Sequence, residues 1–397
     1  MSVALFYRFF YYLQQCVATF PDQHGHRRVT IRVRDSAPGV TRVRKPRTVV
    51  VDDSRFMRGL ITDLLDDAGV PVVGEAADGA EALEVIKEEA PDAVTMDLEM
   101  PGMGGIEAVE RIMDEQPTPV LMLSAHTEDG AEVTFEALDK GAVDFFTKPG
   151  GEVSMGVSQH GEQLVSTVRS VADADLAQAS RQTEADQQRQ PATQTTDGTT
   201  ETGLEPFDDT RTVLIGSSTG GPDAVEQVMS ELPGGDCRVI IIQHMPEAFT
   251  ARFADRLDAA SRYDVQEATD GARIDAGEAV VARGGCHMEI SGYSSGRIRV
   301  GLTDDDLGLS VDPAVNVTME SAAETITDPM TGVILTGMGS DGADGICAIQ
   351  EAGGLTVAQD EASCVIYGMP KRAVEAGCVD EVRSLNDIAT TIRELVP

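Results

Sequence analysis

The 397-residue sequence has no tryptophan and only five lysines, although it contains 67 acidic residues and has a formal net charge of −36. A protein that binds nucleic acid needs a basic face, and one that docks on anionic lipid needs a basic surface. The composition therefore argues against nucleic acid and anionic membranes as partners. A high density of acidic residues with few lysines is typical of proteins from a salt-loaded, haloarchaeal type of cytoplasm, where ions screen the repulsion between like charges.

The sequence also lacks Cys-x-x-Cys pairs and long apolar runs. Without such pairs among the six cysteines, neither a zinc site nor a thioredoxin-type motif is expected. Four cysteines lie in apolar runs, as buried structural cysteines do, which indicates a reducing, cytoplasmic setting. No apolar run reaches ~18 residues, so we expect no transmembrane helix and no stable membrane insertion.

Residues 1–46 differ from the rest of the chain. They hold eight Lys/Arg and two Asp/Glu, a net of +6, which leaves −42 on the remaining 351 residues. Residues 1–20 are rich in aromatics and carry only Arg8, without the leading positive charge of a signal peptide. We interpret residues 1–46 as an atypical extension, either non-native or a disordered tail. The alternative interpretation is an amphipathic anchor for a membrane or receptor.

Short apolar segments alternate with charged helical stretches in two regions of the chain. This alternation predicts two α/β domains, each with a parallel sheet between helices. The segment 162–178 is expected to be the last helix of the first domain. The stretch 179–208 is too polar to bury a core and is expected to be a flexible linker. The expected boundaries are 1–46 (extension), 47–178 (first domain), 179–208 (linker) and 209–397 (second domain).

Three carboxylates follow strands of the first domain. Asp52 and Asp53 end its first strand and Asp97 ends its third, so parallel pairing brings them to one crevice. An oxygen-rich pocket of this kind suits Mg²⁺, a hard cation. Ser124 and Lys148, at the ends of the next two strands, offer a hydroxyl and an ammonium for phosphoryl oxygens.

This ordered set resembles the response-regulator receiver domain, a flavodoxin-like fold with a five-stranded parallel sheet. The resemblance implies that Asp97 is the phospho-acceptor and that Asp52, Asp53 and Asp97 bind Mg²⁺. It also implies that Ser124 and Lys148 form the switch pair, with Phe145 in the aromatic switch position.

The second domain opens with a glycine-rich turn between a strand and a helix, Gly216-Ser217-Ser218-Thr219-Gly220. This matches the G-x-S-x-G nucleophile elbow, which exposes a serine on a sharp turn. The same turn can also hold a phosphate on helix N–H groups, so the motif alone leaves both interpretations open.

Two further residues favour a hydrolase. His244 ends the next strand, and Asp341 follows a later strand in a glycine-rich segment. Ser218, His244 and Asp341 at three strand ends of one sheet form a plausible acyl-transfer triad, with Ser218 as nucleophile, His244 as base and Asp341 as its orienting group. The chain order Ser, His, Asp differs from that of α/β-hydrolases, so we expect a different, doubly wound α/β fold.

From about residue 211 onward the sequence resembles the CheB family of chemotaxis methylesterases. The resemblance rests on the serine motif, Gln243-His244-Met245-Pro246 and the segment 337–342, Gly-Met-Gly-Ser-Asp-Gly. It implies that Thr219 assists in the pocket and that the backbone N–H of Met338 helps form the oxyanion hole. One departure is Asn316, where the family often has aspartate.

The resemblance implies a protein-glutamate methylesterase that removes methyl esters from methyl-accepting chemotaxis receptors, with a CheA-like histidine kinase as phosphoryl donor. The esterase step needs no cofactor, and glutamine deamidation is a related activity that the sequence leaves open. Two other classes compete with this interpretation: a nucleotide-binding α/β domain, and a non-enzymatic adaptor that only docks on receptors. Near the expected cleft, His287 and Cys286 are interpreted as structural residues.

Overall fold

A computed structural model defines residues 45–124, 128–148, 157–174, 207–305 and 307–394. Residues Lys45–Pro397 form one compact unit. The expected extension 1–46 and linker 179–208 lie almost entirely outside the described residues. None of the helices within the described ranges is long and apolar enough to cross a membrane.

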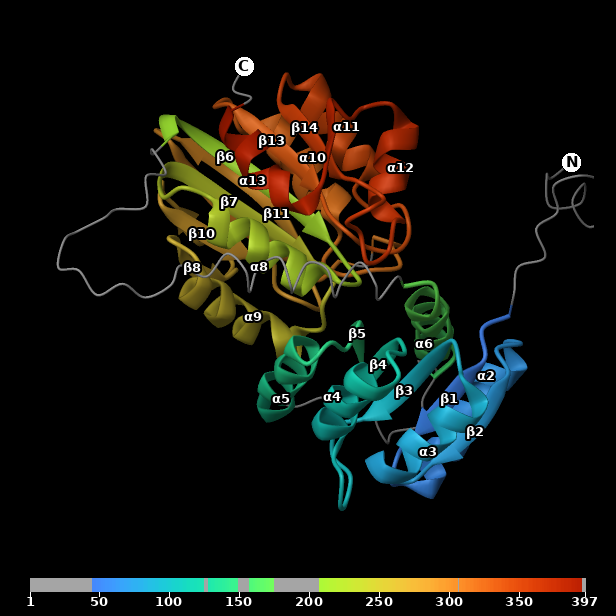
Figure 1. Ribbon diagram of the computed structural model, residues 1–397. Coiled ribbons are helices and arrows are strands. Elements are labelled where there is room, and N and C mark those ends of the chain that lie inside the picture. Colours follow the sequence, from blue (N-terminus) through green and yellow to red (C-terminus); the bar gives the residue numbers. More distant parts are fainter. Residues whose placement is uncertain (1–44, 125–127, 149–156, 175–206, 306, 395–397) are drawn as a thin grey trace, which may run out of the picture. The chain divides into compact units, whose positions relative to one another are not determined.

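The first domain contains the expected parallel sheet of five strands, in the order β2-β1-β3-β4-β5. Strands β3 and β4 are buried at every position, because helices cover both faces of the sheet. The elements are β1 (Thr48–Val51), α2 (Arg55–Asp67), β2 (Val72–Ala76), α3 (Gly79–Glu89), β3 (Ala93–Asp97), α4 (Gly105–Glu115), β4 (Val120–Ser124), α5 (Glu128–Asp139), β5 (Asp144–Thr147) and α6 (Val157–Ala172) (Figure 1).

Local sequence signals set the helix ends in this domain. The Ser54 hydroxyl accepts a hydrogen bond from the Met57 N–H at the start of α2, and the Asp78 carboxylate caps α3 in the same way. Helix α6 begins five residues and ends six residues earlier than the expected 162–178, and its core-packing apolar residues run from Leu164 to Val171.

The second domain is built on a sheet of seven strands in the order β15-β14-β13-β6-β7-β10-β8, with parallel neighbours throughout. This confirms the expected doubly wound α/β fold. The sheet strands are β6 (Phe207–Ser217), β7 (Gly235–Gln243), β8 (Asp264–Glu267), β10 (Glu278–Val281), β13 (Met330–Ile334), β14 (Leu355–Gln359) and β15 (Glu381–Arg383). The helices are α8 (Gly221–Glu231), α9 (Glu247–Ala260), α10 (Val315–Thr325), α11 (Ala343–Glu351), α12 (Met369–Ala376) and α13 (Leu385–Glu394).

Successive side chains of a strand point to opposite faces, and this alternation divides the core into two layers. Val213 and Ile215 of β6 pack in the cluster that includes α8, α9 and α13. Leu214, between them, packs with α10, α11 and α12 on the other face. The sheet is therefore covered on both sides, and polar groups needed for chemistry remain at the strand ends.

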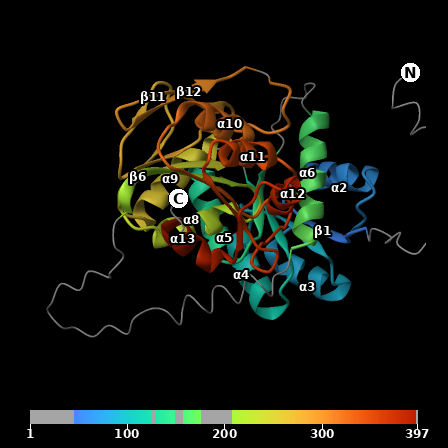
Figure 2. The ribbon, with the colours of Figure 1, turned by 90° about the horizontal axis from the view of Figure 1, so that it is seen from above.

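The sequence analysis missed a small antiparallel sheet in the order β11-β12-β9. It consists of β9 (Arg273–Ile274), β11 (His287–Ser294) and β12 (Arg297–Thr303). Its apolar residues Met288, Ile290, Ile298 and Val300 pack in the same cluster as buried residues of α10. Strand β11 lies next to α10 (Figure 2).

The structure also contains a disulfide, Cys347–Cys378, which the sequence analysis did not predict. It joins α11 to the segment that follows α12. Cys237, Cys286 and Cys364 are free and buried, as expected of structural cysteines.

Candidate active site and phosphorylation site

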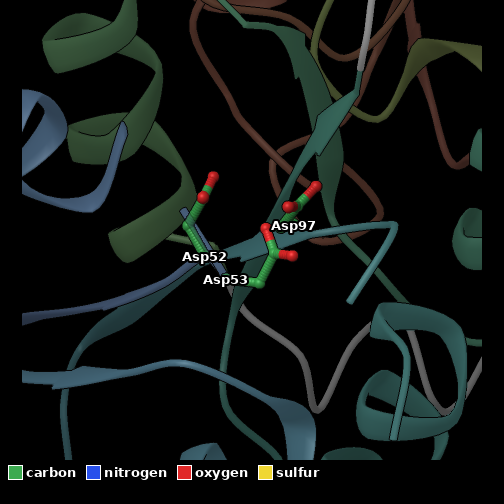
Figure 3. A group of neighbouring side chains, drawn as sticks. All are labelled: Asp52, Asp53 and Asp97. Atoms are coloured by element: carbon green, nitrogen blue, oxygen red, sulfur yellow. The ribbon is translucent and has the colours of Figure 1, made fainter. Parts of the chain in front are cut away.

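The three carboxylates expected to bind Mg²⁺ meet at one end of the first sheet. Asp52 and Asp53 follow β1 and Asp97 ends β3, and these neighbouring strands are parallel, so their carboxyl ends share an edge. One oxygen of each carboxylate lies within 4.8 Å of the other two (Figure 3). Asp52 and Asp97 are buried and Asp53 is exposed. Three oxygen ligands at this spacing fit a Mg²⁺ ion.

Lys148 supplies positive charge to this pocket. Its Nζ lies 2.8 Å from Oδ2 of Asp52 and 2.7 Å from Oδ1 of Asp97. Burial raises the pKa of Asp97 above the ordinary carboxyl value, although the hydrogen bond and charge of Lys148 lower it. The Asp97 carboxylate therefore depends on neighbouring cations to stay ionised.

The residues expected to act as the switch lie on the strands beyond β3. Ser124 ends β4, is buried, and forms a 3.0 Å hydrogen bond with the Thr134 hydroxyl. The ring of Phe145, on β5, packs 4.5 Å from Phe249 of α9 and 6.2 Å from Phe135 of α5, measured between centroids. The aromatic position of the first domain is thus buried against a helix of the second.

Ser218 lies on the turn between β6 and α8. Gly220, which caps α8, has φ 72°, in the left-handed region that favours glycine. A Cβ at Gly337 would meet the Cβ of Ser218 at 2.8 Å and Sδ of Met369 at 2.5 Å. Only glycine allows the backbone before Met338 to come this close to the serine. Within the described residues, the Met338 N–H donates no backbone hydrogen bond.

His244 and Asp341 are brought together as expected. His244 follows β7, the neighbour of β6, and its Nε2 lies 2.8 Å from Oδ2 of Asp341. This leaves Nδ1 as the nitrogen that can serve Ser218. In the described part of the chain, the Ser218 hydroxyl forms no hydrogen bond with His244. Catalytic hydrogen bonds of this kind often tighten only when substrate binds.

The Asp341 carboxylate is held from two sides. Besides His244, it accepts hydrogen bonds from the N–H groups of Val315 (2.6 Å) and Asn316 (3.1 Å), at the start of α10. Burial raises the pKa of Asp341, but His244 and these two N–H groups outweigh it and hold the pKa below the ordinary value. The carboxylate therefore stays ionised and can orient the imidazole.

Asn316 returns this contact, a role that the sequence analysis did not assign. Its Oδ1 accepts hydrogen bonds from the N–H groups of Gly342 and Gly345, each at 2.8 Å, and so caps α11. Asp341, just before α11, caps α10, and Asn316, in α10, caps α11. These reciprocal hydrogen bonds hold the starts of the two helices together. The one sequence signal for this role was the asparagine at position 316, where the family often has aspartate.

Two buried polar residues that the sequence analysis missed hold the serine loop. Gln243 is 2 % exposed; its Nε2 donates to the carbonyls of Ser218 (2.9 Å) and His244 (3.2 Å), and its Oε1 accepts from the Ser217 hydroxyl. Thr336 is fully buried and accepts the Ser218 N–H on its carbonyl at 3.0 Å. The signal for Gln243 was a polar side chain ending a buried strand, just before His244.

Thr219 and Met338, the expected pocket residues, both face the first domain. Thr219 is 5 % exposed, and its side chain bonds to the Asp144 carboxylate, whose pKa burial raises to about 6. Sδ of Met338 is contacted by the hydroxyls of Ser166 and Ser170 on α6. Residues next to the candidate nucleophile are therefore covered by the first domain.

The fold and these two candidate sites together define a class: a two-domain α/β protein with a candidate serine-hydrolase site in its second domain and a receiver-type acidic pocket in its first. Residues 48–155 match the response regulator receiver domain, and residues 213–392 match the CheB methylesterase domain. The chain belongs to the CheB methylesterase family, whose members are enzymes of the carboxylic ester hydrolase class.

Similar proteins cover most of the chain. A protein of Haloarcula marismortui called protein-glutamate methylesterase/protein-glutamine glutaminase is 58% identical over 359 residues, covering 88% of this chain and 97% of its own length. A protein of Natronomonas pharaonis with the same name is 55% identical over 349 residues, with the same two coverages. The solved CheB methylesterase catalytic domain of Thermotoga maritima is 37% identical and covers 47% of this chain and 100% of its own, with a TM-score of 0.45.

Proposed function

We propose that the protein hydrolyses glutamate γ-methyl esters on methyl-accepting chemotaxis receptors, in the cytoplasm, as part of chemotactic adaptation. The observation that carries this proposal is the pairing of His244 with Asp341 at the edge of the sheet where the half-buried Ser218 lies. The names of the haloarchaeal relatives support the substrate class.

In the proposed reaction, Ser218 Oγ attacks the ester carbonyl while Nδ1 of His244 takes its proton. The tetrahedral intermediate collapses when the same proton passes to the methoxy oxygen, so methanol leaves and a glutamyl-serine ester remains. His244 then removes a proton from water, which attacks this ester and releases the glutamate carboxylate and free Ser218. Asp341 orients the imidazole and stabilises its charged form throughout.

The negative oxygen of the intermediate needs hydrogen-bond donors. The N–H of Met338 supports this role, because Gly337 brings that backbone close to Ser218. Donors fixed in advance stabilise developing charge without reorganisation, and losing one typically costs ~10²–10³ in kcat. The same steps applied to a glutamine amide would release ammonia, so the proposal includes deamidation.

The first domain is proposed to control access to this cleft. Contacts of α6 with Met338, and of Asp144 with Thr219, support a state in which the unphosphorylated domain covers the pocket. A chemotaxis histidine kinase would transfer a phosphoryl group to Asp97. Asp52, Asp53 and Asp97 would hold Mg²⁺, which supplies positive charge beside that group. Phosphorylation would then shift the population toward an open state.

The test is methanol release from methylated receptor membranes, with and without a small phosphoryl donor and Mg²⁺. We expect the donor to stimulate release by the wild type, and Ser218→Ala to lower release by at least ~10⁴-fold. Asp97→Asn should keep the basal rate and lose the stimulation. Ser230→Ala, an exposed serine on α8, is the matched control and should behave as wild type.

The outcomes separate the parts of the proposal. Methanol release at the same rate with and without the donor would support the esterase activity and contradict control by phosphorylation. Folded wild type that releases no methanol would favour the deamidase or the adaptor. Nucleotide binding detected by calorimetry would instead favour the phosphate-cradle interpretation of the Ser218 turn.

A further inference from the structure

A hollow of ≈370 Å³ that the proposed reaction does not use is lined by residues of the second domain and by Gln163 of α6. It lies between the start of β11 and the loop that leads from β12 to α10. Two exposed leucines, Leu307 and Leu309, stand at this loop, each 46% exposed. The lining comprises Gln163, Gly285, Cys286, His287, Thr303, Asp304, Asp305, Leu307, Leu309, Ser310, Val311 and Asp312.

One buried ring nitrogen and three carboxylates of this hollow have no partner of the kind that they need among the residues that the structure describes. His287 is 5 % exposed, and its Nδ1 has no hydrogen-bond partner in the structure. The carboxylates of Asp304, Asp305 and Asp312 form no ion pair with any of the described residues. A buried polar atom without a partner is rare. Asp304, Asp305 and Asp312 are exposed, and their like charges repel one another, so a cation placed among them would be stabilised. Both observations indicate a ligand that brings positive charge and hydrogen-bond donors.

The spacing of these groups does not fit a bare metal ion. Within the described residues, the only three carboxylate, imidazole or thiol groups whose ligand atoms come within 4.8 Å of one another are those of Asp52, Asp53 and Asp97. The groups around His287 are farther apart than a metal ion requires. In addition, burial raises the pKa of the Cys286 thiol, so this group stays protonated and is a poor metal ligand.

The hollow adjoins the candidate active site through two short connections. Gly284 packs against the backbone of Met245 and Glu247, directly after His244. Asp312 lies three residues before Val315, whose N–H binds Asp341, so at most ~11 Å of chain separates them. A helix rises ~6 Å over four residues and ~10.5 Å over seven, which is the same scale as this separation.

We propose that this hollow is a substrate subsite that takes an arginine or lysine side chain of the receptor helix, one to two turns from the methylated glutamate. The charged head would meet Asp304, Asp305 and Asp312, with His287 as a further polar partner, while Leu307 and Leu309 cover the aliphatic stem. This inference rests on the proposed function for the identity of the substrate, and it adds a requirement on the sequence around the ester.

The test measures binding, so it does not depend on turnover. The probes are labelled helical peptides with one glutamate γ-methyl ester and one arginine, placed four or seven residues before or after the ester. Each has a partner peptide in which citrulline, a neutral isostere, replaces arginine. Binding to the full-length Ser218→Ala protein is measured by fluorescence anisotropy at constant salt, in the presence of the phosphoryl donor and Mg²⁺.

We expect at least one arginine placement to bind ~10-fold more tightly than its citrulline partner, as a charge-assisted hydrogen bond predicts. The combined change Asp304→Asn, Asp305→Asn and Asp312→Asn should abolish this difference. The combined change Asp236→Asn, Glu289→Gln and Glu351→Gln alters the net charge equally at exposed positions outside the hollow, and should preserve it.

Equal binding of arginine and citrulline peptides at all four placements would overturn the subsite. A preference for arginine that survives in the Asp304/Asp305/Asp312 variant would also overturn it, because the preference would then reflect the net charge alone. If the proposed function is wrong, methanol release from receptor membranes would be absent, whether or not the protein binds the peptides.

Discussion

At the scale of single residues, Asp341 combines two tasks that are separable by experiment. Its carboxylate orients His244 and also caps α10 through the N–H groups of Val315 and Asn316. Both tasks use the ionised form, which explains why its pKa lies below the ordinary value despite burial.

The Asp341→Asn substitution should therefore reduce kcat and stability together. We expect kcat to fall by ~10⁴-fold, because the imidazole loses its orienting charge, and the free energy of unfolding to fall by ~1–2 kcal/mol at neutral pH. A lowered folded-state pKa stabilises above the unfolded value of ~3.9 and loses this effect as pH falls through the folded value. The difference from wild type in urea unfolding should thus shrink below pH ~4.

Asp380→Asn is the matched control. The pKa of Asp380 is also lowered, since hydrogen bonds from Thr356 and Gln350 outweigh its burial, but it lies outside the site. We expect a similar dependence of stability on pH and an unchanged kcat. An Asp341→Asn protein with wild-type kcat would contradict the proposed orienting role.

At the scale of elements, the site depends on how helix ends meet strand ends. Ser218, His244 and Asp341 come from loops after β6, β7 and β13, three neighbouring parallel strands. Asp341 accepts a hydrogen bond from the start of α10, and Asn316 accepts one from the start of α11. The loop that carries Asp341 is therefore held to α10 by hydrogen bonds at Asp341 and at Gly342.

We expect Asn316→Ala to destabilise the protein by ~1 kcal/mol, because the first N–H groups of α11 lose their side-chain acceptor. The loop should then move, and kcat should fall by ~10²-fold with little change in KM, as expected for a misplacement of about 1 Å. The free energy of unfolding and the kinetics of methanol release are the measurements.

Asn386→Ala is the control for this change, since Asn386 bonds to Gln227 on a different helix pair. It should leave kcat unaltered. If both variants lower kcat equally, the effect of Asn316 is general destabilisation and not the position of Asp341.

At the scale of the whole molecule, charge is the dominant feature. A net charge of −36 on one chain produces strong self-repulsion at low salt. Screening should remove it, because the Debye length falls from about 10 Å at 0.1 M salt to about 3 Å at 1 M.

We expect the midpoint of thermal unfolding to rise by ~5 °C or more between ~0.1 and ~2 M KCl, with most of the rise below ~1 M. Sucrose of equal osmolality is the control, since it stabilises by exclusion and does not screen charge. A rise of the same size in sucrose would show that screening is not the cause.

Much of the site could be predicted from the sequence because it depends on local signals. Buried strands are recognisable as apolar runs, and residues directly after parallel strands share one edge of the sheet. That rule predicts that Asp52, Asp53 and Asp97 lie together and that His244 lies near Asp341, and the structure has both groupings. The charge of the chain and its division into two α/β domains also follow from the sequence alone.

Only the tertiary structure decided which distant groups meet. The Asn316–Gly342 bond, the Cys347–Cys378 disulfide and the contact of Ser170 with Met338 join residues far apart in the chain, and no periodic pattern encodes them. The hollow at His287 is of the same kind, because it forms only where a strand start meets the loop before α10. Sequence periodicity fixes which face of an element is buried, whereas packing determines what that face meets.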